Sequence, residues 1–256
     1  MRWRFLLSPP GNGPGNMALD HALMERARRT GETVLRVYTW ASPVLSLGRN
    51  QRAQGVYAQE ELDRRTIAVV RRPTGGRALL HHREITYSVT APAPPHEGLT
   101  ATYDRVNALL LDALGSLGVP VALARPAGRS VAPSALPCFA EPARGEIVVG
   151  GRKLVGSAQW RQDGALLQHG SIIVDDDQAL IPSLMREPSP RAPAPATLRA
   201  VLRRAPAPEE LADAVFGAVR RTVDATATPL TLTEVAALDL VPCLALYCDP
   251  EWTWRR

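Results

Sequence analysis

The 256-residue chain is long enough for one large domain or two small ones with a substantial core. Its net charge of +5 favours acidic partners, but the arginines are scattered and aromatic residues make up only 5%, which argues against a nucleic-acid-binding surface. The three cysteines lack metal-ligand spacing and fit a reducing cytoplasm, and no apolar run approaches the roughly 18 residues of a membrane span.

The predicted elements follow one another in the manner of an α+β domain. Asn16 is expected to cap a helix that ends near Arg29, and further helices are predicted at 58–65, 100–118, 208–224 and 231–239. Strands are predicted at 2–8, 33–40, 43–48, 67–70, 78–81, 85–90, 146–149, 153–160 and 165–174. Because tight turns join most of these strands, we expect a mixed, mainly antiparallel sheet flanked by helices.

Two proline-rich segments interrupt this pattern. Residues 124–145 are predicted to form a long loop, and loops of this length are often functional. Six prolines between 188 and 208 indicate a linker over 188–207. The predicted organisation is therefore a catalytic domain at 1–187, the linker, and a helical extension at 208–256 that packs on the same domain.

A single lysine, Lys153, stands among 30 lysines and arginines. Lysine can lose its proton and present a compact charge, which arginine cannot do, so this position is a candidate for chemistry rather than a surface lysine spared by drift. Strand alternation predicts a face that carries Lys153, Val155, Ser157 and Gln159. The small Gly156 and Ala158 between them leave room for a substrate, and the return strand with His169 and Gly170 is expected to bring that histidine near the lysine face.

A glycine turn joins two predicted strands and carries several cations. Its residues are Arg71, Arg72, Thr74, Gly75, Gly76 and Arg77, followed by His81. Paired glycines allow a close backbone approach, and free N–H groups beside arginines suit a phosphate or a pantetheine-like arm. An ordinary hairpin turn remains the alternative, and the segment matches neither a Walker A loop nor a Rossmann fingerprint. The neighbouring His81-His82-Arg83-Glu84 lacks zinc-ligand spacing, so no metal site is expected.

Cys138 lies in the poorly apolar 124–145 segment, unlike the other two cysteines. Cys243 and Cys248 are surrounded by apolar residues and are expected to pack as small hydrophobic side chains. A nearby cation lowers the pKa of a thiol from its usual value of about 8.5, and Lys153 is the candidate cation. Such a pair suits acyl transfer, because lysine stabilises the thiolate and then takes a proton from an incoming amine.

Taken together, these motifs resemble the biotin/lipoate protein ligase superfamily, which includes lipoate–protein ligase A. Within it, the pattern is most similar to the Gram-positive-type octanoyltransferases. The resemblance runs nearly end to end, and its motifs occur in the family's order at 16–20, 71–88, 137–139, 151–159 and 167–172, followed by the tail at 251–255.

The resemblance implies a class II synthetase-like domain that moves an octanoyl group from acyl carrier protein to a lysine of a lipoyl domain, typically the glycine cleavage H protein. It places the nucleophile on Cys138 and the family lysine on Lys153, fifteen residues later. It also implies that Gly75 and Gly76, with Gly156, Ser157 and Ala158, cradle the acyl chain and thioester. No cofactor and no metal are expected for this reaction.

The chain departs from the family at His82, where aspartate is common, and at His21, where glutamate is common. A competing function is that of an ATP- and magnesium-dependent ligase that adenylates free lipoate. Cys138, and Arg77 in place of a third glycine, favour the transferase. Two further candidate functions are an amidotransferase between lipoyl domains and a carrier-binding module without chemistry.

Overall fold

The computed structural model describes residues 2–94, 98–124, 145–187 and 193–256. The strands are β1 (Trp3–Leu7), β2 (Thr33–Tyr38), β3 (Val44–Leu47), β4 (Ala68–Arg71), β5 (Leu79–His81), β6 (Glu84–Pro92), β7 (Ala122–Leu123), β8 (Ile147–Val149), β9 (Arg152–Gln162), β10 (Ala165–Ile173) and β11 (Thr228–Pro229). The helices are α1 (Gly13–Thr30), α2 (Gln59–Arg64), α3 (Leu99–Ser116), the 3₁₀ helix η1 (Gln178–Leu184), α4 (Leu198–Leu202), α5 (Pro208–Thr222), α6 (Leu232–Ala236), α7 (Val241–Cys248) and α8 (Pro250–Trp254).

An eight-stranded sheet in the order β11-β1-β2-β6-β10-β9-β8-β7 forms the centre of the molecule, and β4-β3-β5 form a smaller sheet. β1 pairs in parallel with β2 and β11, whereas every pairing from β2 to β7 is antiparallel. The predicted mixed, mainly antiparallel sheet is therefore confirmed, and each predicted strand corresponds to an observed one. All nine residues of β10 are buried.

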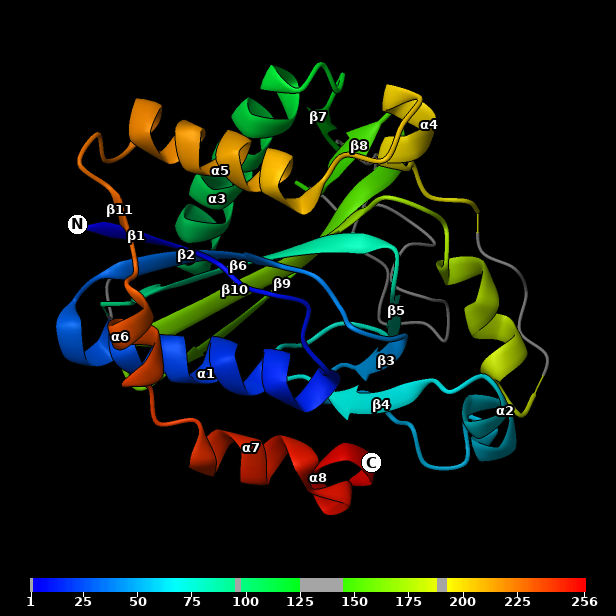
Figure 1. Cartoon of the computed structure of the whole chain (residues 1–256). Helices are drawn as coiled ribbons and strands as arrows, with labels where there is room; N and C mark the ends of the chain where they lie inside the picture. Colours follow the sequence, from blue (N-terminus) through cyan, green and yellow to red (C-terminus); the bar gives the residue numbers. More distant parts are fainter. Residues whose placement is uncertain (1, 95–97, 125–144, 188–192) are drawn as a thin grey trace.

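Helices cover both faces of the large sheet (Figure 1). α3 and α5 pack against each other over one face, and α1 and α7 lie on the other. The apolar positions of α3 recur every three to four residues and enter the main core cluster, which also holds apolar side chains of α5 and of the central strands. Burying each such side chain stabilises the fold by about 1.5–3 kcal/mol.

The start of α1 differs from the prediction. Asn12 is the N-cap and accepts a hydrogen bond from the Gly15 N–H, so the cap lies four residues before the predicted one. Asn16 is instead a buried residue inside the helix, and its side-chain oxygen accepts a hydrogen bond from Arg36 at 2.8 Å. The Gly-Pro-Gly sequence that follows Asn12 has the composition of a turn, but proline is well tolerated in the first turn of a helix.

Several elements were not predicted. α4 forms within the proposed linker, and Ala196 and Leu198 are buried in the main core cluster. α7 packs along α1, and α8 follows it after Asp249. The strands β7 and β11 contain two residues each and exist through pairing with distant segments.

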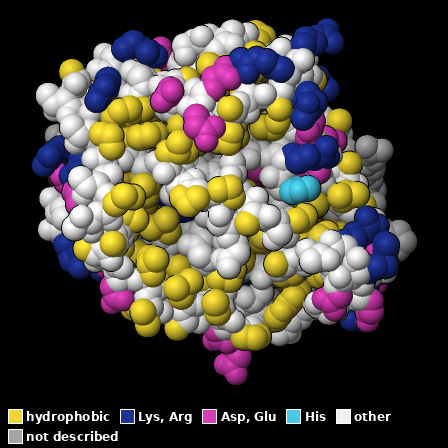
Figure 2. Space-filling view, viewed as in Figure 1, with side chains coloured by type: hydrophobic (Ala, Val, Ile, Leu, Met, Phe, Trp, Pro, Cys, Tyr) yellow, Lys and Arg dark blue, Asp and Glu magenta, His cyan; other side chains and the backbone are white. Residues whose placement is uncertain are grey.

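The face shown in Figure 2 carries apolar side chains across its middle, with acidic and basic groups mostly around them. Within the described ranges, no helix combines the length and hydrophobicity that a membrane crossing requires. The described residues also contain no group of three potential metal ligands.

Candidate active site

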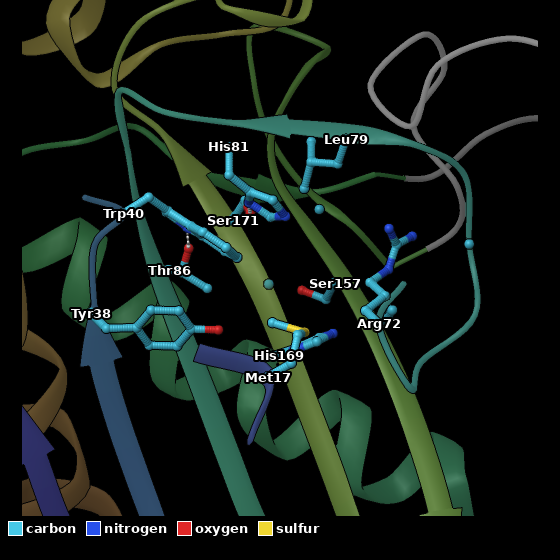
Figure 3. A pocket seen from close by; sticks show the side chains of 14 residues that line it. Met17, Tyr38, Trp40, Arg72, Leu79, His81, Thr86, Ser157, His169 and Ser171 are labelled. Atoms are coloured by element: carbon cyan, nitrogen blue, oxygen red, sulfur yellow. Dashed lines mark hydrogen bonds between the residues drawn. The ribbon is translucent and has the colours of Figure 1, made fainter. Parts of the chain in front are cut away.

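A pocket with about 440 Å³ of empty space, its open side included, lies where α1 meets β9 and β10 (Figure 3). Its lining consists mainly of apolar, aromatic and small residues with a few polar groups: Met17, Tyr38, Trp40, Arg72, Gly76, Leu79, His81, Thr86, Gly156, Ser157, Ala158, His169, Gly170 and Ser171. Such a lining suits an apolar chain whose polar end is held by a small number of hydrogen-bonding groups.

Gly170 on β10 lets the neighbouring strands β9 and β6 approach closely beside the pocket. A Cβ atom at this position would lie 2.6 Å from the carbonyl oxygen of Gly156, 2.7 Å from the Tyr87 ring and 2.8 Å from Ser157 Oγ. The Tyr87 hydroxyl and Ser157 Oγ share a hydrogen bond of 2.7 Å directly beside it. Any side chain at position 170 would therefore push β9, β10 and β6 apart.

The strand register corrects the predicted arrangement of His169. This residue pairs with Ala158, and Gly170 pairs with Ser157, so His169 points to the opposite face of the sheet from Ser157. The predicted alternation from Lys153 also fails at its start. The β8–β9 register shifts near Ile147, and the consecutive residues Leu154 and Val155 are both buried in the main core cluster.

The glycine turn is held by a buried arginine. Arg72 donates from Nη2 to the carbonyl oxygens of Gly75 at 2.9 Å and Arg77 at 2.7 Å, and from Nη1 to Ser46 Oγ at 3.0 Å. Gly76 has φ +96°, a conformation that L side chains rarely adopt. These bonds fix the turn beside the pocket, so it is more than a solvent-exposed hairpin.

A second glycine, Gly48 at the end of β3, contacts this turn backbone to backbone. A Cβ atom at Gly48 would lie 2.0 Å from the Gly76 carbonyl oxygen. Gly48 was not predicted as a site residue, because it lies 28 residues from Gly76 in the chain.

His169 belongs to a buried polar network at the α1 side of the pocket. Its Nε2 lies 2.7 Å from Thr74 Oγ1, and its Nδ1 lies 3.4 Å from Asp20 Oδ2. Asp20 also accepts hydrogen bonds from Arg36 at 2.7 Å and Tyr38 at 2.9 Å. Burial alone would raise the pKa of Asp20, but the charge of Arg36, together with the interaction with His169 and a hydrogen bond from Ser88, lowers it below its usual value. The carboxylate thus links α1 to the pocket wall.

The stability of the fold is expected to fall as the pH decreases below about 6.5. Burial lowers the pKa of His169 although Asp20 opposes this change, so the unfolded state binds a proton at a higher pH than the folded state does. Urea unfolding at pH 7.5 and pH 5.5 measures the effect, and each pH unit in this window costs at most about 1.4 kcal/mol per histidine. His169→Gln should show a smaller loss on acidification; an unchanged loss would contradict the assignment.

A second network surrounds His81 at the other side of the pocket. The ring stacks on Trp40 at 3.9 Å between centroids, and its two nitrogens lie 2.7 Å from Glu84 Oε1 and Ser46 Oγ. Ser171 also donates to the same Glu84 oxygen at 2.6 Å. His81 therefore has one fixed orientation, and Ser46 connects it to Arg72.

Lys153 is 3% exposed, and its Nζ donates to Glu146 Oε1 at 2.7 Å. The lone lysine is therefore not a surface residue. Glu146 was not identified from the sequence. It lies seven residues before Lys153 in the chain, and only the pairing of β8 with β9 brings the two side chains together. Lys153 does not belong to the pocket lining, which on β9 begins at Gly156.

The other predicted site residues fall into three groups. Arg71 is fully buried and does not reach the pocket, because its guanidinium donates to the carbonyl oxygens of Gly48 and Thr253. Thr74, Gly75 and Arg77 belong to the turn but do not line the pocket. Cys138 lies outside the described residues.

The aromatic and aliphatic part of the pocket was not predicted from the sequence. Met17 lies in α1, Tyr38 ends β2, Trp40 follows it in the loop, and Leu79 begins β5, and all four look like ordinary core residues in the sequence. Asn16 and Met17 were predicted only to be part of a family motif. The fold, rather than one local sequence pattern, brings the four positions together.

The family model of the lipoyl protein ligase A/B catalytic domain matches residues 12–220, which include every pocket-lining residue. The chain belongs to this family. The octanoyltransferase LipM of Kyrpidia tusciae is 37% identical over 99% of both chains. The octanoyltransferase LipM of Symbiobacterium thermophilum is 38% identical over 99% of this chain and 98% of the relative.

Solved structures show the same fold at lower identity. Lipoate-protein ligase A bound with ATP superposes with a TM-score of 0.78 at 21% identity over 99% of both chains. A bi-partite lipoate protein ligase from Thermoplasma acidophilum gives 0.76 at 20% identity, over 99% of this chain and 96% of that one. These comparisons confirm the predicted superfamily and fold. They also confirm the predicted enzyme class, which is an octanoyltransferase of the lipoate-protein ligase family.

Proposed function

We propose that the chain transfers an octanoyl group from the thioester of acyl carrier protein to a lysine of an apo lipoyl domain, such as the glycine cleavage H protein, in the cytoplasm. The observation that supports this most strongly is the apolar pocket at Gly156 and Gly170, within a chain 37% identical to an octanoyltransferase over nearly its whole length. An eight-carbon chain suits the apolar walls, and its carbonyl end requires the polar groups.

The proposed reaction has two steps. The thiolate of Cys138 attacks the thioester carbonyl, a new carbon–sulfur bond forms, and the bond to the pantetheine sulfur breaks, which releases the carrier thiol after protonation. The amine of the target lysine then attacks the acyl-enzyme; a carbon–nitrogen bond forms and Cys138 leaves as the thiolate. We assign to Lys153 three linked roles: its ammonium stabilises the Cys138 thiolate, it gives its proton to the departing pantetheine sulfur, and the neutral amine that results takes up the proton of the attacking lysine.

Neighbouring residues are proposed to bind and orient the acyl group. Backbone N–H groups near Gly76 or Ser157 are the candidate donors to the carbonyl oxygen that becomes negative during each attack. Arg72 and His81 support this region because they hold the turn and one pocket wall in place. The reaction requires neither ATP nor a metal, since the thioester supplies an activated acyl group.

The test is intact-protein mass spectrometry of the wild-type enzyme mixed with octanoyl-carrier protein in the absence of ATP. We expect one octanoyl adduct, which disappears when an apo lipoyl domain is added and reappears on that domain. If transfer starts only after ATP and free lipoate are supplied, the enzyme is a ligase. If octanoyl-H protein forms the adduct but octanoyl-carrier protein does not, the enzyme is an amidotransferase.

A further inference from the structure

The last helix, α8, forms hydrogen bonds with β4 and with the loop after β3. The Trp252 indole N–H donates to the Arg71 carbonyl oxygen, and Arg71 Nε donates to the Thr253 carbonyl oxygen, both at 2.8 Å. The Gln54 side chain donates to the Trp254 carbonyl oxygen, also at 2.8 Å. α8 therefore has a fixed position beside β4, as Figure 1 shows.

This position brings four arginines together, which we call the terminal arginine cluster: Arg49, Arg71, Arg255 and Arg256. The Arg255 guanidinium lies 3.9 Å from the Trp252 ring centroid and donates to the Arg49 carbonyl oxygen. The Arg49 guanidinium lies 5.9 Å from the same ring. Two cations thus share one indole.

Among the described residues, acidic side chains do not form ion pairs with the outer arginines of this cluster. Across the described ranges, no carboxylate side chain lies within the 4.0 Å ion-pairing distance of Arg49, Arg255 or Arg256. Burial, followed by the charges of Arg255, Arg256 and Arg72, lowers the pKa of Arg71 to about 10. Cations held this close repel one another, so the arrangement is most stable when an anionic surface covers it.

The cluster adjoins the pocket without lining it. The Arg49 guanidinium lies 5.3 Å from the Trp160 ring centroid. Trp160 follows Ala158, a pocket residue, by two positions on the same face of β9. Arg49 also follows Gly48, whose backbone contacts Gly76 in the pocket wall.

We propose that the terminal arginine cluster is the docking surface for the acidic face of the carrier protein that delivers the octanoyl thioester. This inference rests on the proposed function. The side chains of Arg255 and Arg256 are exposed and offer separate charges, which match carboxylates spread over a protein surface better than they match one phosphate.

The distance from the pocket favours the donor over the acceptor. A pantetheine arm is about as long as five extended residues, roughly 17 Å, so its carrier can dock beside the pocket rather than over it. A lysine side chain is much shorter, and an acceptor domain must therefore bind at the pocket opening itself.

The test compares two donors with the double variant R255Q/R256Q. We expect the KM for octanoyl-carrier protein to rise about tenfold, with kcat unchanged, and to depend less on salt than in wild type. The KM for octanoyl-phosphopantetheine, which has the arm and phosphate without the protein, should change less than about twofold, because it lacks the carboxylates. The control variant R204Q/R221Q removes two ion-paired arginines from the α4–α5 layer on the opposite side of the sheet, and it should leave both KM values unchanged.

Three outcomes would overturn the docking assignment. An equal rise in the KM for octanoyl-phosphopantetheine would indicate a phosphate site, and a rise confined to the KM for the lipoyl domain would indicate an acceptor site. An unchanged KM with both donors would show that the cluster has no role in docking. Binding of labelled carrier protein, measured by fluorescence anisotropy with wild type and R255Q/R256Q, tests docking without turnover. If carrier binding is normal but no octanoyl transfer occurs, the proposed function fails and the docking surface does not.

Discussion

Cys138→Ala is expected to lower the rate of octanoyl transfer by at least about 10³-fold and to abolish the acyl adduct. The substitution removes the sulfur that accepts the octanoyl group, and neither Lys153 nor a water molecule replaces a thiolate in attack on a thioester. Transfer kinetics with octanoyl-carrier protein and an apo lipoyl domain measure the loss, and a thermal unfolding curve shows whether the variant is folded.

The other two cysteines provide the matched controls. Burial, followed by the charges of Glu25 and Asp239, raises the pKa of Cys243 to about 11, so this thiol stays protonated near neutral pH. Cys248 is exposed at the end of α7. Cys243→Ala and Cys248→Ala should retain the adduct and the transfer rate. Full transfer by Cys138→Ala would show that the reaction proceeds without this acyl-enzyme.

Lys153→Met is expected to lower the transfer rate by about 10²–10⁴-fold, because the thiolate loses its cation and the incoming amine loses its proton acceptor. It should also destabilise the fold by about 3–5 kcal/mol, because it leaves the Glu146 carboxylate buried without the ammonium group that contacts it at 2.7 Å. Activity and unfolding free energy must therefore be measured together.

A double variant separates these two effects. Lys153→Met with Glu146→Gln removes both charges, so much of the lost stability should return while transfer stays low. Lys153→Arg keeps the charge but brings a larger group that does not release its proton, and we expect it to be nearly as inactive as Lys153→Met. If the double variant regained transfer along with stability, Lys153 would have a structural role only.

The sequence predicted the elements that have a strong local pattern. The β9 and β10 strands and the helices α3 and α5 follow from alternation and from apolar spacing, which tertiary contacts then reinforce. The α1 start was misplaced because glycine and proline suggested a turn, whereas Asn12 caps that segment. β11 was missed because its pairing with β1 joins segments more than 200 residues apart.

For the site, sequence patterns identified polar residues better than they identified the apolar pocket walls or the face of the sheet on which each side chain lies. Arg72, His81, Gly156, Ser157 and Gly170 all line the pocket. His169 also lines it, yet from the face opposite Ser157. The face on which a side chain lies depends on the register between the strands, which no local sequence pattern reveals. Arg71 resembled a ligand-binding arginine, but the carbonyl groups that hold it come from a loop and a helix whose proximity no local pattern reveals.

The burial of Lys153 has a consequence for an enzyme that attaches acyl groups to lysine. Such an enzyme has to avoid labelling itself while it holds a reactive acyl group. Here the only lysine of the sequence is 3% exposed and bonded to Glu146, so its amine is shielded from a second acyl-enzyme. The positive charge of the surface resides on guanidinium groups, which stay protonated and are poor acyl acceptors. An arginine-rich surface therefore attracts acidic partners and offers no competing lysine amine to the acyl group.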